Sequence, residues 1–214
     1  MLLFLLLLFP LSLTAYCVYK KDPKQFIAVV TGLLVSAIVC AFNFFFKFSH
    51  RVVPYSFGLN FVYYLEKLGL ITVVVIYGLF FLVSKDTYED RIDYFNSLML
   101  SCYAVFVPFY VITGTESSVY PGFEIFVKPV IYLAMIFATG SILKVFYTSI
   151  ADKKVGMAIL NGAACIVVML IPSVIEAMYA INFSFGIILI VSLVYSLLPV
   201  GIWCLKLLKD NKAE

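Results

Sequence analysis

Seven long apolar stretches follow one another along the chain, and only short polar segments separate them. A helix that crosses ~30 Å of hydrocarbon needs about 20 residues, because each residue advances it by about 1.5 Å. The pattern therefore predicts spanning helices at about residues 2–19, 25–46, 61–84, 94–112, 129–148, 155–177 and 185–205. Lipid does not tolerate open sheet edges, so we expect an all-α polytopic transmembrane bundle. Connections such as KKDPK and KDTYEDRID are too short for a soluble domain, so residues 1–214 are expected to form a single integral membrane domain.

Composition agrees with this pattern. Apolar residues make up 64% of the chain and charged residues 13%, and the mean hydropathy is +1.09. A soluble domain carries about 25% charged residues, so the lipid bilayer is the expected partner of this surface. The formal charge of +3 is small and scattered, which argues against nucleic-acid binding. The five cysteines fall inside apolar stretches and show no C-x-x-C spacing.

Basic residues predict the orientation of the bundle. With the N-terminus outside, eleven of the fifteen lysines and arginines fall on the inner side, which the positive-inside rule favours. The four that remain outside are Lys47, Arg51, Lys67 and Lys128. The C-terminus is then cytoplasmic, and we expect the protein in a membrane such as the bacterial cytoplasmic membrane.

The first apolar stretch could be a cleaved signal, a lipoprotein signal or a first span. No basic residue precedes Lys20, and Tyr16 stands where a lipoprotein signal needs a small residue before Cys17. We therefore expect this stretch to remain as the first span.

Three charged residues close to predicted helix ends form the candidate ligand-binding site. Glu66 and Glu176 lie toward the outer ends of two spans, and Lys128 precedes Pro129, the expected first residue of the fifth span. One interpretation is that the three are separate interfacial anchors. The other is that their spans are neighbours, so that the three side chains form an outward pocket with one net negative charge, suited to a cationic headgroup or an amine.

Other features predict helix packing. Gly32, Ser36 and Cys40 recur every four residues, as do Ala158 and Gly162, and such small-residue faces allow close approach of helices. Asn161 is expected to hydrogen-bond a neighbouring helix. Pro10, Pro108, Pro172 and Pro199 fall inside spans, where each favours a kink and so either a hinge or a cavity.

No catalytic constellation emerges, so we do not expect an enzyme, a metal site or a cofactor. His50 is the sole histidine, which excludes histidine-rich metal centres. The run KDTYEDRID lacks the spacing and glycine of a calcium loop and is interpreted as a solvated loop. The last span contains no lysine before Lys206, which excludes a retinal Schiff base.

Two classes of function remain. The protein is either a small permease or permease subunit for an uncharged or amphipathic solute, or a non-catalytic subunit that organises a membrane assembly. Partners other than lipid would then be other membrane subunits or further copies of the same chain. The apparent lack of charge inside the bundle argues against proton-coupled transport.

Overall fold

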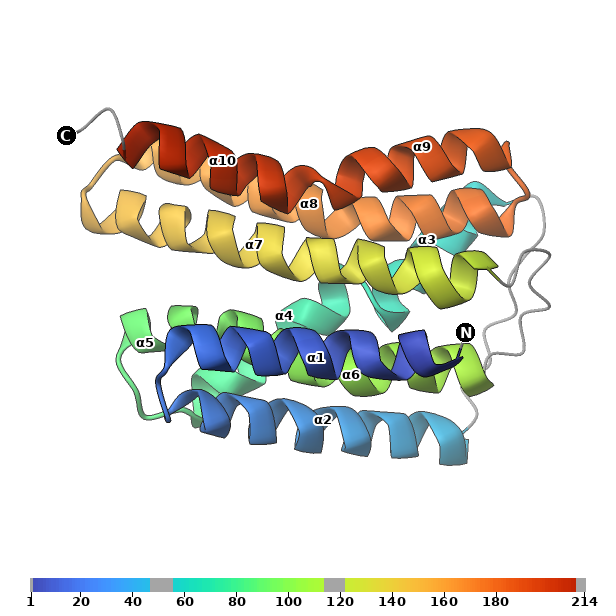
Figure 1. Ribbon diagram of the computed structural model, residues 1–214, viewed down its shortest axis with the longest axis horizontal. Coiled ribbons are helices and arrows are strands. Elements are labelled where there is room, and N and C mark those ends of the chain that lie inside the picture. The colour runs from blue at the N-terminus through green and yellow to red at the C-terminus, as the bar shows by residue number, and fades with distance from the viewer. Residues whose placement is uncertain (1, 47–55, 114–121, 211–214) are drawn as a thin grey trace.

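The computed structural model describes residues 2–46, 56–113 and 122–210 and shows only helices and turns over these ranges (Figure 1). Seven helices or interrupted helices in these ranges are long and apolar enough to cross a membrane, which confirms the predicted multi-pass helical bundle. The helices are α1 (Leu2–Lys20), α2 (Gln25–Phe46), α3 (Phe57–Lys67), α4 (Leu70–Val83), α5 (Tyr88–Asp93), α6 (Phe95–Thr113), α7 (Lys128–Ala151), α8 (Val155–Ala180), α9 (Phe185–Ser196) and α10 (Leu198–Asp210). A π-helical segment, η1 (Phe123–Val127), leads directly into α7.

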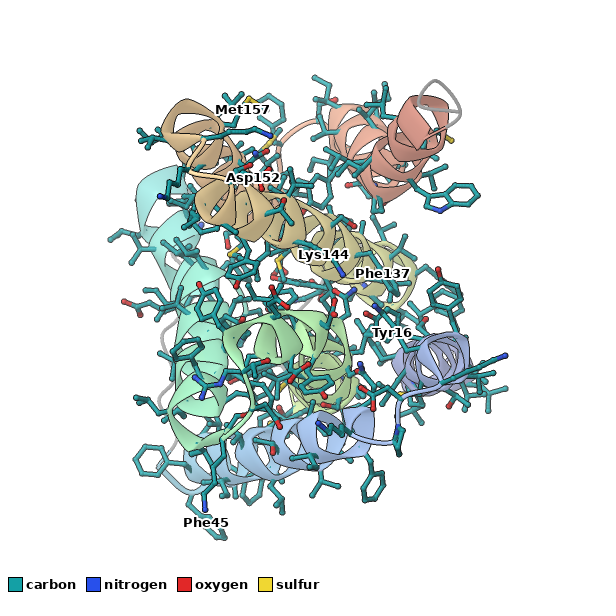
Figure 2. The ribbon with its side chains drawn as sticks, turned by 90° about the vertical axis from the view of Figure 1, so that its left-hand side faces the viewer. Tyr16, Phe45, Phe137, Lys144, Asp152 and Met157 are labelled. Carbon is teal, nitrogen blue, oxygen red and sulfur yellow. The ribbon has the colours of Figure 1, made fainter. Side chains whose placement is uncertain are left out.

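The helices form two groups. Helices α1 and α2 pack on α6, whereas α8, α9 and α10 pack on α7 (Figure 1). Helix α3 lies against α8, and α4 contacts α2, α6 and α8, so this interrupted span joins the groups. Figure 2 shows the same division from one end, with Tyr16 of α1 and Phe137 of α7 meeting between the groups. Helix α6 and its lead-in are the most buried span at 61%, so α6 is the centre of the bundle.

The turns alternate between the two ends of the bundle. The α1–α2 turn, helix α5, the α7–α8 turn and the end of α10 lie together at one end (Figure 1). We call it the basic end, because Lys20, Lys144 and Lys153 lie there. From the positive-inside rule, we expect this end to face the cytoplasm.

The third span is interrupted rather than continuous from 61 to 84. Helix α3 ends at Lys67 and α4 begins at Leu70, and the Tyr64 carbonyl accepts both the Leu68 and the Gly69 N–H groups at 3.1 Å. The Thr72 hydroxyl donates to the Glu66 carbonyl at 2.9 Å and to the Lys67 carbonyl at 3.0 Å. Such substitute donors allow a helix to break at membrane depth.

The seventh span divides at Leu197, between α9 and α10. Pro199 lies in the first turn of α10, where it supplies no N–H group to the preceding helix. This break is at one of the four prolines expected to disturb a span. The break at Gly69 involves no proline and was not predicted.

Several boundaries differ from those expected. The run interpreted as a solvated loop contains the short helix α5, which Thr87 caps by accepting the Asp90 N–H group. The fifth span begins at Phe123 rather than Pro129, because η1 continues into α7. Helix α8 extends to Ala180, three residues beyond the expected end.

The small-residue face of α2 lies against α6. A Cβ atom on Gly32 would come within 2.0 Å of Ser101 Oγ and 2.6 Å of the Leu98 carbonyl, so this approach requires glycine. Ser36 and Cys40 are buried on the same face. On α8, a Cβ atom on Gly162 would lie 3.2 Å from Phe146 of α7, and Ala158 is buried nearby. The Asn161 amide donates to the Met157 carbonyl of its own helix at 2.8 Å, so the expected bond to a neighbouring helix is replaced by a local one.

Candidate functional site

An ionic cluster of Glu124, Lys128 and Glu176 is enclosed at the end of the bundle opposite the basic end. Lys128 Nζ lies 2.9 Å from Glu176 Oε2 and 3.2 Å from Glu124 Oε2. The side chains of Lys128 and Glu176 are only 4% and 3% exposed. The Tyr132 hydroxyl donates to Glu176 Oε1 at 2.6 Å, and the Tyr64 ring lies 5.6 Å from Lys128 Nζ. Two carboxylates and one ammonium give the cluster one formal negative charge.

The π-helical turn positions this cluster. The Lys128 N–H group donates to the Phe123 carbonyl five residues back, and Pro129 has no N–H group to donate. The wide turn places Glu124 and Lys128 beside each other on η1 and the first turn of α7. Because the span begins at Phe123, Lys128 lies about 7 Å inside it by helical rise. Single π-turns within helices occur frequently at functional sites.

The structure brings together two of the three residues of the sequence-derived site. Lys128 and Glu176 are in direct contact, so the interpretation of these two as separately solvated anchors is wrong. Glu66, the third predicted member, is exposed. The second carboxylate beside Lys128 is that of Glu124. The net charge expected of the pocket is unchanged, because one glutamate replaces another.

Lys67 is a further cation at the same end, and no sequence pattern indicated a role for it in the site. Its ammonium donates a hydrogen bond to the Tyr63 hydroxyl and lies 4.8 Å from the Tyr110 ring centroid. Tyr110 in turn accepts a hydrogen bond from the Asn43 amide at 2.7 Å. The Tyr63 hydroxyl therefore stabilises this charge by a hydrogen bond, and the Tyr110 ring does so by cation–π attraction.

The break between α3 and α4 meets α6 and α8 just inside the ionic cluster. The buried Tyr103 hydroxyl of α6 donates to the Leu68 carbonyl, which the break leaves accessible. A Cβ atom on Gly69 would lie 2.4 Å from Ser173 Oγ of α8. The Ser173 hydroxyl is itself buried, and no hydrogen-bond partner for it lies in the part of the chain that the structure describes. The Tyr103 ring also packs against the tilted ring of Tyr132 at a centroid distance of 5.2 Å, which connects the break to the cluster.

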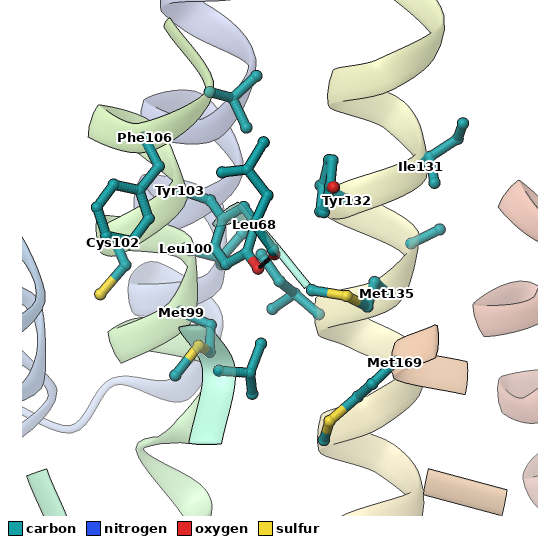
Figure 3. Close-up of a cluster of buried hydrophobic side chains, with 14 of the residues drawn as sticks. Leu68, Met99, Leu100, Cys102, Tyr103, Phe106, Ile131, Tyr132, Met135 and Met169 are labelled. Atoms are coloured by element: carbon teal, nitrogen blue, oxygen red, sulfur yellow. Dashed lines mark hydrogen bonds between the residues drawn. The ribbon is translucent and has the colours of Figure 1, made fainter. Parts of the chain in front are cut away.

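Three buried methionines fill the middle of the bundle. Met99 of α6, Met135 of α7 and Met169 of α8 lie in one apolar group, with Leu68 and Leu100 beside them (Figure 3). We call Met99, Met135 and Met169 the methionine cluster. Methionine is unbranched and readily changes rotamer, so it packs tightly in one state and repacks easily in another.

A second set of polar groups lies between the methionine cluster and the basic end. Asn96 Oδ1 of α6 and Thr139 Oγ1 of α7 are buried without a hydrogen-bond partner among the described residues. Asn96 lies against Gly140, where a Cβ atom would come within 2.0 Å of Asn96 Oδ1. Farther out, Asp93 Oδ1 lies 2.8 Å from Lys144 Nζ and 3.7 Å from Lys20 Nζ. The Asp93–Lys144 ion pair joins α5 to α7 and is partly exposed.

These groups follow the same order on two facing helices. Asn96, Met99 and Tyr103 share one face of α6, and Thr139, Met135 and Tyr132 share one face of α7, since residues three or four apart align on a helix. Helix α8 adds Met169, Ser173 and Glu176 at the same spacing. The interface between the two helix groups is therefore polar toward both ends and apolar in the middle.

Comparison with protein-family models, with curated proteins and with solved structures finds no match to this chain. Within the described ranges, no group of three or more histidine, cysteine, aspartate or glutamate side chains is arranged to hold a metal ion. His50 lies outside those ranges. The facing surfaces of α6, α7 and α8 therefore form the candidate functional site.

Proposed function

We propose that the protein is a small permease, or the membrane-spanning subunit of one, for an uncharged or amphipathic solute. The solute would pass between the two helix groups, along the faces of α6, α7 and α8. The observation that carries this proposal is the pattern of buried oxygens without partners. Ser173 Oγ lies on one side of the methionine cluster, and Asn96 Oδ1 and Thr139 Oγ1 lie on the other.

Unpartnered buried oxygens cost free energy, because they lose their hydrogen bonds to water. A solute with hydroxyl or amide groups would supply those bonds on each side of the apolar middle. Interrupted helices beside such groups are a common element of transporters, and the break at Gly69 contacts Ser173 directly.

The ionic cluster fits a closing contact at the end opposite the basic end. A buried ion pair costs desolvation energy that apolar side chains would not, so its presence in a membrane span favours a functional role. Lys128 joins α7 to α8 through Glu176, and Tyr64 of α3 covers it. Lys128 and Glu176 stay in the same helix group, so movement of α3 away from α7 and α8 would expose the charged groups to water and open a path to Ser173.

Reconstituted vesicles test the proposal. Entry of glycerol, xylitol and glucose is followed by stopped-flow light scattering, and transfer of a fluorescent phosphatidylcholine is followed by dithionite quenching. At least one of these solutes is expected to move faster than in protein-free vesicles. Met135→Trp should slow this transport, because the larger side chain would obstruct the apolar middle of the path. Met157→Trp, at a surface position that is 50% exposed, should not slow it.

The alternative function, a non-catalytic subunit of a membrane assembly, draws on a different observation. The first and seventh spans are only 11% and 17% buried, so most of α1 and α9–α10 is available to a partner subunit or a second copy. Failure of every solute to exceed protein-free vesicles, together with a stable complex isolated from native membranes, would favour this alternative over the permease.

A further inference from the structure

A groove with a volume of about 470 Å³ lies on the surface of the α7–α8 hairpin, close to the turn at the basic end. Small side chains form its floor, since Ala158, Gly162 and Ala163 leave space beside Phe146. Ile159 borders it and is 69% exposed. The groove therefore opens on the bundle surface, where the hydrocarbon of a membrane lies.

The lining has almost no polar character. Ser149 contributes a hydroxyl, but this group donates to the Val145 carbonyl of its own helix at 2.8 Å. Lys153 is the exception, and it lies in the turn at the groove mouth. Neighbouring Lys154 pairs with Asp152 at 2.9 Å, whereas no carboxylate partner of Lys153 occurs among the described side chains.

We propose that this groove binds an anionic phospholipid, with one acyl chain along Gly162 and the phosphate beside Lys153. The apolar floor matches a hydrocarbon chain, and the lysine at the mouth matches the negative headgroup. The first N–H groups of α8 point toward the same turn without a side-chain cap, and a helix N-terminus favours anions. This lipid site is independent of the proposed transport, because it lies on the outer surface of the hairpin.

The turn geometry offers a variant that removes the charge without harming the fold. Lys153 has a φ of 58°, in the left-handed region that glycine adopts readily, so Lys153→Gly should preserve the turn. Lys21 has a φ of 53° in the α1–α2 turn at the same end and does not line the groove. Lys21→Gly is therefore a matched control for charge and conformation.

Native mass spectrometry of the detergent-solubilised protein measures the headgroup preference. Phosphatidylglycerol and phosphatidylcholine with identical acyl chains are added in turn, and the bound fractions are compared. Wild type and Lys21→Gly should prefer phosphatidylglycerol, and Lys153→Gly should lose about fivefold of that preference, the effect of one lysine near a membrane surface. An equal loss in both variants would show a diffuse charge effect and overturn the site.

A second pair of variants tests the groove itself. Ala163→Phe fills the floor, and Ala41→Phe makes the same change at an exposed position of α2. Ala163→Phe should release the bound phosphatidylglycerol, and Ala41→Phe should retain it. Unchanged binding by Ala163→Phe would overturn the proposal, because the acyl chain would then lie elsewhere.

Discussion

Lys128 compensates two carboxylates at once, so the members of the ionic cluster are not equivalent. If Glu176 loses its charge, Lys128 keeps Glu124 at 3.2 Å. If Lys128 is removed, Glu176 remains buried with no second cation beside it among the described residues, and the Tyr132 hydroxyl is its remaining donor. Replacing the lysine should therefore destabilise the protein more than replacing Glu176.

We expect Lys128→Met to destabilise the protein by about 3–5 kcal/mol, the cost of leaving a buried charge unpaired. Glu176→Gln should cost about 1–3 kcal/mol, because the amide oxygen still accepts from Tyr132. The double variant should be more stable than Lys128→Met alone. The measurement is thermal unfolding in detergent with a thiol-reactive dye, since Cys102 and Cys165 are buried and become reactive on unfolding. Additive losses in the double variant would contradict the compensation.

At the scale of elements, the α3–α4 break and the proline in α8 are each stabilised by a hydroxyl group on a neighbouring helix. Pro172 cannot donate to the Val168 carbonyl four residues before it, and the buried Tyr195 hydroxyl donates to that carbonyl at 2.7 Å. In the same way, Tyr103 donates to the Leu68 carbonyl at the α3–α4 break. Each tyrosine thus links an irregular point in one span to another helix.

Tyr195→Phe should destabilise the protein by about 1–2 kcal/mol, because it leaves the Val168 carbonyl unpaired in an apolar region. In a Pro172→Ala background the new N–H group can close the helical hydrogen bond, so the same substitution should cost much less. Tyr19→Phe, at a position that is 79% exposed, serves as the control and should have no effect. The same thermal assay measures this double-mutant cycle, and equal costs in both backgrounds would refute the explanation.

Gly69→Ala should destabilise by about 1–3 kcal/mol, because the new methyl group would meet Ser173 Oγ at 2.4 Å. Ser173→Ala alone should be nearly neutral, since the hydroxyl that it removes has no partner. The double variant should recover part of the loss, but not all, because Leu65 Cα would also lie 3.1 Å away. Unfolding temperatures of the three variants test this expectation.

The sequence was sufficient for the number of spans, because each apolar stretch has the length that a bilayer requires. It did not reveal the break at Gly69, since one glycine in an apolar run is common in spans and Thr72 supplies the substitute bonds only in three dimensions. It also began the fifth span at Pro129 instead of Phe123 and so left Lys128 outside it, because the π-turn before Pro129 has no sequence signature that we recognised.

At the scale of the whole molecule, the sequence does not show which face of each helix points to the bundle interior and which points to lipid. Lipid and bundle interior are both apolar, so hydrophobic periodicity does not distinguish the face of α7 that carries Met135 from the opposite one. The repeated spacing of a methionine with a polar residue or tyrosine on α6, α7 and α8 is the signal that could have located the site. Its meaning appears only when the three faces are brought together.

Orientation is also a property of the whole molecule, and it remains a prediction from the basic residues. In a background with Cys17 and Cys204 changed to serine, an impermeant maleimide on intact cells should label Ser184→Cys but not Lys154→Cys, both of which are exposed. Permeabilised cells should allow both to react. If intact cells label Lys154→Cys and not Ser184→Cys, the predicted orientation is wrong. Ser117, which the same rule predicts to lie on the outer side, is outside the described residues.

The methionine cluster has a chemical consequence as well as a packing one. Peroxide converts an accessible thioether to a sulfoxide, which is polar and no longer fits an apolar interior. Met99, Met135 and Met169 are at most 8% exposed in this state, whereas Met157 is 50% exposed. Oxidation of Met157 therefore reports the reagent dose, and oxidation of the three buried sulfurs reports how often the two helix groups separate. Each separation also carries a risk, since one sulfoxide in the middle would hinder the groups from closing again.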